Sequence, residues 1–151
     1  MPAVVGGPPA YFHPYADAVA ALVDQRLAAT GRAVIIDVHS NPQRRLPYER
    51  HPDRRRPAVC LGVDDQHTPD WLLAAATNAF AAIGDVAVNE PFAGTYVPMR
   101  HYEAGDTRVA SVMVELRRTE ATQPSGGSDP LSPGTAQELA SLVDAATDRP
   151  W

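Results

Sequence analysis

The chain has 151 residues, of which 44% are hydrophobic, and a formal net charge of −5. A chain of this length forms one domain that buries about 68–70% of its unfolded surface, which is enough for a hydrophobic core. It is mildly acidic and has no long basic run, so it lacks the positive surface that nucleic acids and anionic membranes select. We therefore expect neither of these partners.

Cys60 is the single cysteine, so an internal disulfide is excluded, and its apolar neighbours favour a buried thiol. No segment approaches the ~20 apolar residues that span a bilayer. The Pro/Gly-rich start also lacks the basic and apolar parts of a signal peptide. We expect a cytoplasmic protein.

The first third of the chain predicts a helix, a strand and a loop. Residues 12–30 have helical apolar spacing, and Gly31 ends the helix. The apolar, β-branched run 33–38 is typical of a buried parallel strand rather than an edge strand. The Pro/Arg-rich residues 41–57 predict a loop. The expected inward face of the helix is Tyr15, Val19, Leu22, Val23 and Leu27.

The middle of the chain predicts a second strand at residues 58–63, followed by a helix. Thr68 suits the N-cap and Pro69 the first helical position, in a helix that we expect to reach Ile83. We assign the neighbouring His67 to the same capping segment. The expected inward face of this helix is Leu73, Ala76, Phe80 and Ile83.

The last part of the chain predicts strands at residues 86–88 and 111–116, a linker at 121–131 and a terminal helix at 132–147. Strands that alternate with helices predict an α/β fold. We expect a single three-layer domain over residues 1–151, with a mostly parallel sheet flanked by helices.

His39 follows the first apolar strand, at the place where α/β sheets gather their working residues. A neutral imidazole there is a natural zinc ligand, and Asp37 is placed to orient it. The alternative is a histidine whose nitrogens bond backbone groups at a strand end. Position alone leaves both interpretations open.

Glu115 lies in an otherwise apolar strand, where a carboxylate is costly unless it is paired or has a task. A buried glutamate suits a general base that acts on metal-bound water. The alternative is an outward-facing carboxylate paired with Arg118 or with Arg117, which shares its face of the strand.

More polar side chains precede that strand, in a stretch punctuated by Gly and Pro. Arg100 is able to bind a carboxylate with two hydrogen bonds, although most loop arginines are only solvated. His13 and Asp17 have a helical spacing that can share a metal, but such spacing is common by chance. The candidates in this stretch are Asn89, Arg100, His101 and Tyr102.

Several segments, taken in order, resemble the N-formylglutamate amidohydrolase family. The likeness spans residues 11–120, and the ordered combination is more specific than any one piece. The segments are Tyr15–Val19, Ile36–Pro42 with its Asp-Val-His-Ser motif, Asn89–Tyr96, His101–Tyr102 and Val112–Arg118 with its Val-Glu-Leu-Arg motif.

The resemblance implies a zinc-carboxypeptidase-like, phosphorylase/hydrolase-like fold in which a glutamate activates a zinc-bound water. It implies hydrolysis of N-formyl-L-glutamate to formate and L-glutamate, late in histidine degradation. On this basis His39 is a Zn²⁺ ligand and Glu115 the catalytic base. The substrate contacts that the resemblance implies are Asn89, Arg100, His101 and Tyr102.

The chain also departs from the family, because nothing in it matches the upstream His-Ser-Gly segment and the acidic ligand that follows. A catalytic zinc needs three protein ligands plus water, and the matched part supplies one. The chain is then a shortened, inactive form, the carboxyl-terminal part of a longer protein, or a chain that borrows ligands from a partner or from His13 and Asp17. We favour truncation at the N-terminus.

We therefore expect a metal-dependent amidohydrolase of the N-formylglutamate type, with an N-acyl amino acid substrate and little activity as this chain alone. The alternative is a non-catalytic, truncated remnant that binds a small amino-acid-like ligand or a partner chain. A third interpretation keeps the chemistry but changes the substrate to another N-acyl amino acid or a small peptide. An incomplete sheet also predicts self-association or an upstream partner fragment.

Overall fold

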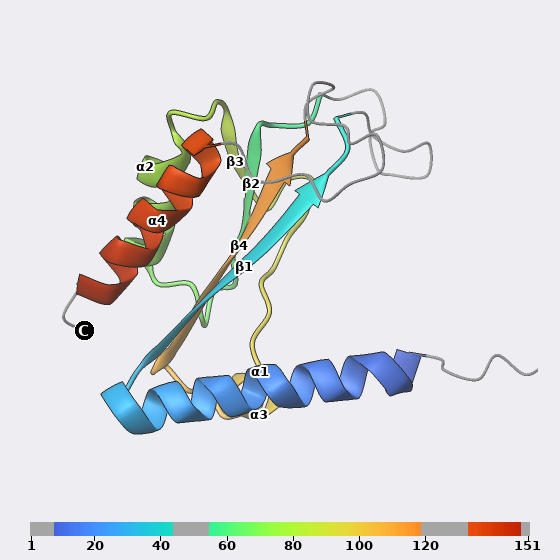
Figure 1. Cartoon of the computed structure of the whole chain (residues 1–151), viewed down its shortest axis with the longest axis vertical. Helices are drawn as coiled ribbons and strands as arrows, with labels where there is room; N and C mark the ends of the chain where they lie inside the picture. The colour runs from blue at the N-terminus through green and yellow to red at the C-terminus, as the bar shows by residue number, and fades with distance from the viewer. Residues whose placement is uncertain (1–7, 44–54, 119–132, 149–151) are drawn as a thin grey trace, which may run out of the picture.

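The computed structural model describes residues 8–43, 55–118 and 133–148, and it has the α/β character that the sequence predicts (Figure 1). The predicted linker at 121–131 lies outside the described residues. No helix among the described residues is long and apolar enough to cross a membrane. In chain order the elements are α1 (Pro8–Thr30), β1 (Ala33–Asn41), β2 (Val59–Gly62), α2 (Asp70–Phe80), β3 (Val86–Val88), α3 (Met99–Glu103), β4 (Val109–Arg117) and α4 (Pro133–Asp148).

The described strands form one sheet in the order β1-β4-β2-β3. β1 pairs with β4 and β2 pairs with β3 in parallel, whereas β2 and β4 are antiparallel. Two of the three pairings are thus parallel, as expected, but the sheet as a whole is mixed. A strand buried on both faces is apolar whichever way it runs, so strand composition alone did not reveal the antiparallel pair.

β1 pairs in parallel with β4 along its whole length, but it lies at the edge of the described sheet and not in its interior. Val38 is 42% exposed, and only the two ends of the strand are buried. β4, in contrast, is flanked by β1 and β2 and is buried along most of its length. The apolar run predicted the strand correctly but did not reveal how many neighbours it has.

One face of the sheet packs against α2 and α4, which lie side by side on it (Figure 1). Ala76 and Phe80 are fully buried, as expected, but Leu73 and Ile83 are only partly buried, and Leu72, which was not expected to face inward, is fully buried. The helix ends at Phe80, three residues before the predicted end. The strand residues of this core are Val59, Leu61, Ala110, Val112, Val114 and Leu116.

The start of α2 differs from the prediction. Pro69 is the N-cap residue and no side chain caps the helix. The hydroxyl of Thr68 instead donates to the Ser111 carbonyl at 2.7 Å and accepts from the Asp64 N–H at 3.0 Å. Thr68 therefore joins the loop to β4, and the predicted N-cap is wrong.

The opposite face of the sheet packs against α1, but only near the amino ends of β1 and β4, so helices cover both faces as a three-layer fold requires (Figure 1). Val23 is buried there against Ala33 and Val109. Tyr15 and Leu22, which were expected to face inward, are 62% and 63% exposed. A 23-residue helix is about 35 Å long, and α1 extends well past the part of the sheet that it covers.

The segment between β3 and α3 crosses the middle of this second face. A Cβ on Gly62 would lie 2.1 Å from the carbonyl oxygen of Gly94, so only glycine allows the segment to approach β2 so closely. Farther along, the Thr95 and Ser111 hydroxyls are 2.7 Å apart, and Ser111 also bonds the Tyr96 carbonyl at 2.8 Å. The segment thus lies against β2 and β4 and leaves the carboxyl end of β1 at the margin.

Candidate active site

His39 and Glu115 are paired in register on the parallel strands β1 and β4. Side chains of residues paired in this way project from the same face of a sheet. This is the face crossed by the segment between β3 and α3, and it is opposite the α2/α4 core. The geometric condition for a ligand and a base that act on one molecule is therefore met.

Asp37 lies two residues before His39 and projects from the same face. Its Oδ1 is 3.0 Å from Nε2 of His39, and the His39 side chain is 49% exposed. The carboxylate is placed to orient the imidazole through Nε2, and Nδ1 has no hydrogen-bond partner among the described residues. The contact that the sequence predicts between these two residues is present.

Glu115 is half-buried, and its Oε2 accepts a hydrogen bond of 2.9 Å from Nδ2 of Asn41. Asn41 itself is only 6% exposed. The alternative partner Arg117 donates to the Arg56 carbonyl at 2.5 Å, and no ion pair joins it to Glu115 among the described residues. The sequence analysis missed Asn41, although its position two residues after His39 places it on the same face.

Cys60 is the register partner of Glu115 on the other side, in β2. It is 1% exposed, and its thiol donates to the Phe92 carbonyl at 3.2 Å. Burial raises the pKa of the Cys60 thiol, and the negative charge of Glu115 raises it further. The expected buried thiol is confirmed, and it stays protonated beside Glu115.

Tyr96 is a second residue that the sequence analysis did not select for the site. Burial raises the pKa of its phenol, and the charges of Asp17 and Asp37 contribute to the same shift. The phenol is therefore neutral and able to donate a hydrogen bond. An aromatic hydroxyl within the segment that crosses the sheet was the only sequence signal.

Asn89 stabilises a turn. It follows β3 with a left-handed backbone, φ 54°, and its Oδ1 accepts from the N–H groups of Val63 and Gly94 at 2.9 and 3.2 Å. The amide oxygen that would contact a substrate is thus bonded to the protein. The structure gives Asn89 the role of shaping the segment that crosses the sheet.

Arg100 lies on the short helix α3 and binds α1. Its guanidinium pairs with Asp24 and donates to the Ala20 carbonyl. Val109, which follows α3, and Glu115 are roughly 20 Å apart along β4 at about 3.3 Å per residue. The structure therefore does not bring Arg100 together with His39 and Glu115.

His101, beside Arg100, is buried with both ring nitrogens bonded. Nε2 lies 3.1 Å from Asp24 and Nδ1 lies 3.0 Å from Asp106. Both neighbours are carboxylates, so a ring nitrogen that carries a proton donates it to the carboxylate that it faces. Hydrogen bonds hold the pKa of Asp106 well below its usual range, and the bond from Arg108 has a larger effect than the bond from His101.

Tyr102 also lies at this end of the molecule. Its hydroxyl is 3.4 Å from a carboxylate oxygen of Asp64, and its ring packs against His67 with centroids 5.5 Å apart. His67 is 1% exposed, with Nδ1 2.9 Å from the Val109 carbonyl. The residues expected to contact substrate after Asn89 thus bind other parts of the protein.

The described residues do not form a complete zinc site. No group of three or more His, Cys, Asp or Glu side chains among them is arranged to hold a metal ion. A catalytic zinc requires three protein ligands and an open position. His39, with its exposed ring, fits one ligand position, so any complete set would need donors from outside the described residues.

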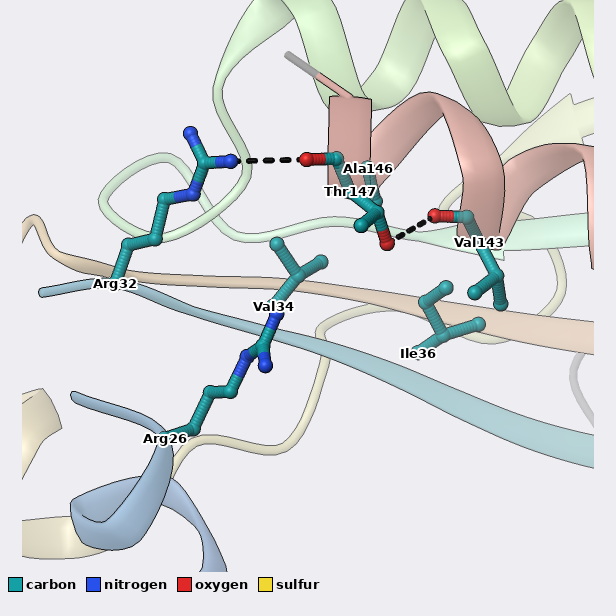
Figure 2. A pocket seen from close by; sticks show the side chains of 7 residues that line it. All are labelled: Arg26, Arg32, Val34, Ile36, Val143, Ala146 and Thr147. Carbon is teal, nitrogen blue, oxygen red and sulfur yellow. Dashed lines mark hydrogen bonds between the residues drawn. The ribbon is translucent and has the colours of Figure 1, made fainter. Parts of the chain in front are cut away.

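A cavity of about 280 Å³ lies on the other face of the sheet, between the edge of β1 and α4. Figure 2 shows Arg26 and Arg32 beside an apolar floor that includes Val34 and Ile36. Arg32 donates to the Thr147 carbonyl at 2.9 Å and so caps the end of α4. This cavity is separated from His39 and Glu115 by the sheet and forms no part of their site.

Comparison with known proteins agrees with the resemblance seen in the sequence. The model of the family described as N-formylglutamate amidohydrolase matches residues 9–121. No curated protein matches the chain significantly.

Two solved structures share the fold. The crystal structure of N-formylglutamate amidohydrolase from Ralstonia eutropha is similar with a TM-score of 0.63 and 20% identity, over 93% of this chain and 53% of that one. A gene product of Agrobacterium tumefaciens is similar with a TM-score of 0.50 and 20% identity, over 93% of this chain and 48% of that one. The chain thus spans about half the length of the solved structures it matches. Through the match over residues 9–121, the chain belongs to the N-formylglutamate amidohydrolase family.

Proposed function

We propose that this protein is a metal-dependent amide hydrolase that converts N-formyl-L-glutamate and water into formate and L-glutamate. One observation carries the proposal: His39 and Glu115 are paired in register on one face of the sheet, within a chain of this family. Assays with other N-acyl amino acids would show whether the same chemistry acts on a different substrate, because loop contacts determine substrate specificity. We further propose that the protein works in the cytoplasm, in histidine degradation.

In this proposal Glu115 is the general base. It takes a proton from water as the water oxygen attacks the formyl carbon, and it returns a proton to the nitrogen as the C–N bond breaks. Formate and the free amine of glutamate are then the products. Asp37 keeps the His39 ring fixed, and the neutral phenol of Tyr96 offers a hydrogen-bond donor nearby.

Zinc, when bound, would polarise the carbonyl and the attacking water. His39 supplies one donor, and we propose that the remaining ligands come from an upstream segment or a partner chain. The shorter span of this chain relative to the solved structures supports this proposal. We further propose that the complete fold is zinc-carboxypeptidase-like. The described residues alone do not complete a metal site.

The second candidate function is a non-catalytic remnant that binds a small amino-acid-like ligand or a partner chain. The specific observation in its favour is that the described residues contain no group of three potential metal ligands. A remnant would retain the fold and the His39–Asp37 contact without turnover.

The deciding experiment measures zinc content and formate release for the purified 151-residue chain, with and without an upstream fragment. We expect weak zinc binding and almost no formate release from the chain alone, because one histidine cannot hold the ion against solvent. His39→Ala should abolish the residual zinc binding, and His13→Ala tests separately whether His13 is a recruited ligand. Stoichiometric zinc and steady turnover from the chain alone would show that its own residues, such as His13 and Asp17, complete the site. Failure of formate release in both forms would favour the remnant.

A further inference from the structure

We infer that Asn41 is the positioning residue of Glu115: its side-chain amide holds one carboxylate oxygen and leaves the other free to accept a proton. The inference rests on the proposed function, because it assigns Asn41 a purpose within the same site. The contact itself is a property of the structure and can be tested separately.

The backbone of Asn41 is held firmly. It is the last residue of β1, paired in register with Arg117, and its carbonyl accepts the N–H of Arg118 at 2.9 Å. The residue is 6% exposed. The side chain therefore starts from a fixed point and has little room for other conformations.

The bond from Nδ2 of Asn41 to Oε2 of Glu115 is 2.9 Å long, a normal length for an amide that donates to a carboxylate. It limits rotation of the Glu115 carboxylate about its last side-chain bond. A general base needs one oxygen with a free lone pair in a defined direction, and Oε1 accepts no hydrogen bond from the described residues. The opposite orientation of the amide would place two oxygens against each other, so the carboxylate itself decides which end of Asn41 faces it.

The other end of the same amide shows that this arrangement has a cost. Oδ1 of Asn41 is buried and has no hydrogen-bond partner among the described residues. A buried acceptor without a donor costs about 1–3 kcal/mol. A leucine of similar size would avoid that cost, so packing alone does not favour asparagine here. The bond to Glu115 is the gain that the structure shows in return, and such exceptions concentrate at functional sites.

The first test detects the bond without any assay of activity. The chain contains Asn41, Asn78 and Asn89 as its asparagines, so ¹⁵N-asparagine labelling gives three pairs of side-chain amide signals in an NMR spectrum, one pair for each NH2 group. We expect one signal with a downfield, exchange-protected proton that disappears in Asn41→Leu and moves upfield in Glu115→Ala. It should stay in place in the control Glu103→Ala, whose residue is exposed on α3. A signal that Glu115→Ala does not move would overturn the inference.

The second test separates positioning from folding. In any preparation that releases formate, Asn41→Leu should lower kcat by about 10–100-fold, the usual effect of losing a group that orients a catalytic residue. KM should stay within about twofold, because substrate binding is not involved. The exposed Asn78→Leu is the control and should leave both constants unchanged. An unchanged kcat in Asn41→Leu would overturn the positioning role. Absence of turnover both with and without an upstream fragment would contradict the proposed function and leave the NMR result to decide the contact.

Discussion

Two polar clusters lie at opposite ends of β4, and both combine histidine with carboxylates. The carboxyl-end cluster consists of Asp37, His39, Asn41 and Glu115. The amino-end cluster consists of Asp24, Arg100, His101, Asp106 and Arg108. Sequence alone assigned members of both clusters to one site, and the structure separates them by most of the length of the strand.

The clusters differ in how completely their polar atoms are bonded. In the amino-end cluster both nitrogens of the buried His101 face a carboxylate, and both oxygens of Asp106 accept from Arg108 at 2.8 Å. In the carboxyl-end cluster His39 is 49% exposed, and Glu115 has one bonded oxygen. Groups whose bonding capacity is filled stabilise the fold, whereas groups with free lone pairs are available to a ligand.

The largest effect of a substitution is expected in the carboxyl-end cluster. In a form of the protein that releases formate, Glu115→Gln should lower kcat by about 10²–10⁴-fold, because the amide cannot accept the proton. Stability should change little, since a half-buried glutamine still accepts a bond from Asn41. Steady-state kinetics and thermal melting check both points, with Glu103→Gln as the control. Near-normal turnover would remove Glu115 from the base role and break the contrast between the clusters.

A substitution in the amino-end cluster should instead lower the stability of the fold. Asp106→Ala removes the acceptor for His101 and Arg108, and hydrogen bonds to charged groups contribute about 1.5–3 kcal/mol each. We expect the free energy of unfolding, measured with urea, to fall by about 1.5–3 kcal/mol in total for the loss of both contacts of Asp106. The exposed Asp144→Ala on α4 should change it little. An Asp106→Ala variant as stable as its parent would show that the cluster does not hold the fold together.

Local patterns predicted the elements well, because helical and strand periodicity depend on neighbours in sequence. The strand at 86–88 and the carboxyl-terminal helix lie close to where they were expected. The selection of His39 and of Glu115 likewise rested on the residues of their own strands. Such features depend on few residues, which is why the sequence reveals them.

Features that depend on distant partners were not predictable in the same way. Asp24, the partner of Arg100 and His101, lies 76 and 77 residues before them in the chain, and nothing in its helix marks it. Tyr15 and Leu22 have the spacing of an inward face, but α1 extends past the sheet. The edge position of β1 likewise depends on which strands are present beside it, and not on its own residues.

Acid should reduce the contribution of the amino-end cluster to stability in a defined pH range. Arg108 and His101 hold the pKa of Asp106 below its ordinary value of 3.8, so this carboxylate favours the folded state above that value. This contribution to stability is lost as the pH falls from about 4 through the lower pKa of Asp106 in the folded state, because the protonated carboxyl no longer binds Arg108 and His101 as an anion. Comparison of unfolding free energies for the parent and Asp106→Asn from pH 7 to pH 2.5 isolates the effect. We expect the difference between them to shrink below pH 4, and a constant difference would exclude the linkage.

The smallest effect is expected for substitution of Arg100. This variant tests whether the amino-end cluster also binds the substrate. Arg100 and Asp24 are 51% and 52% exposed, and an exposed ion pair contributes only about 0.2–1 kcal/mol. If Arg100 mainly ties α3 to α1, Arg100→Ala should lower the free energy of unfolding by that small amount and leave KM for N-formylglutamate unchanged. The structure supports this outcome, because the guanidinium is bonded to Asp24 and Ala20 and lies near the amino end of β4. Kinetics with N-formylglutamate and with a formylated amine that lacks carboxylates provide the check. A rise in KM confined to N-formylglutamate would assign Arg100 to substrate recognition and would require α3 to move toward Glu115 during the reaction.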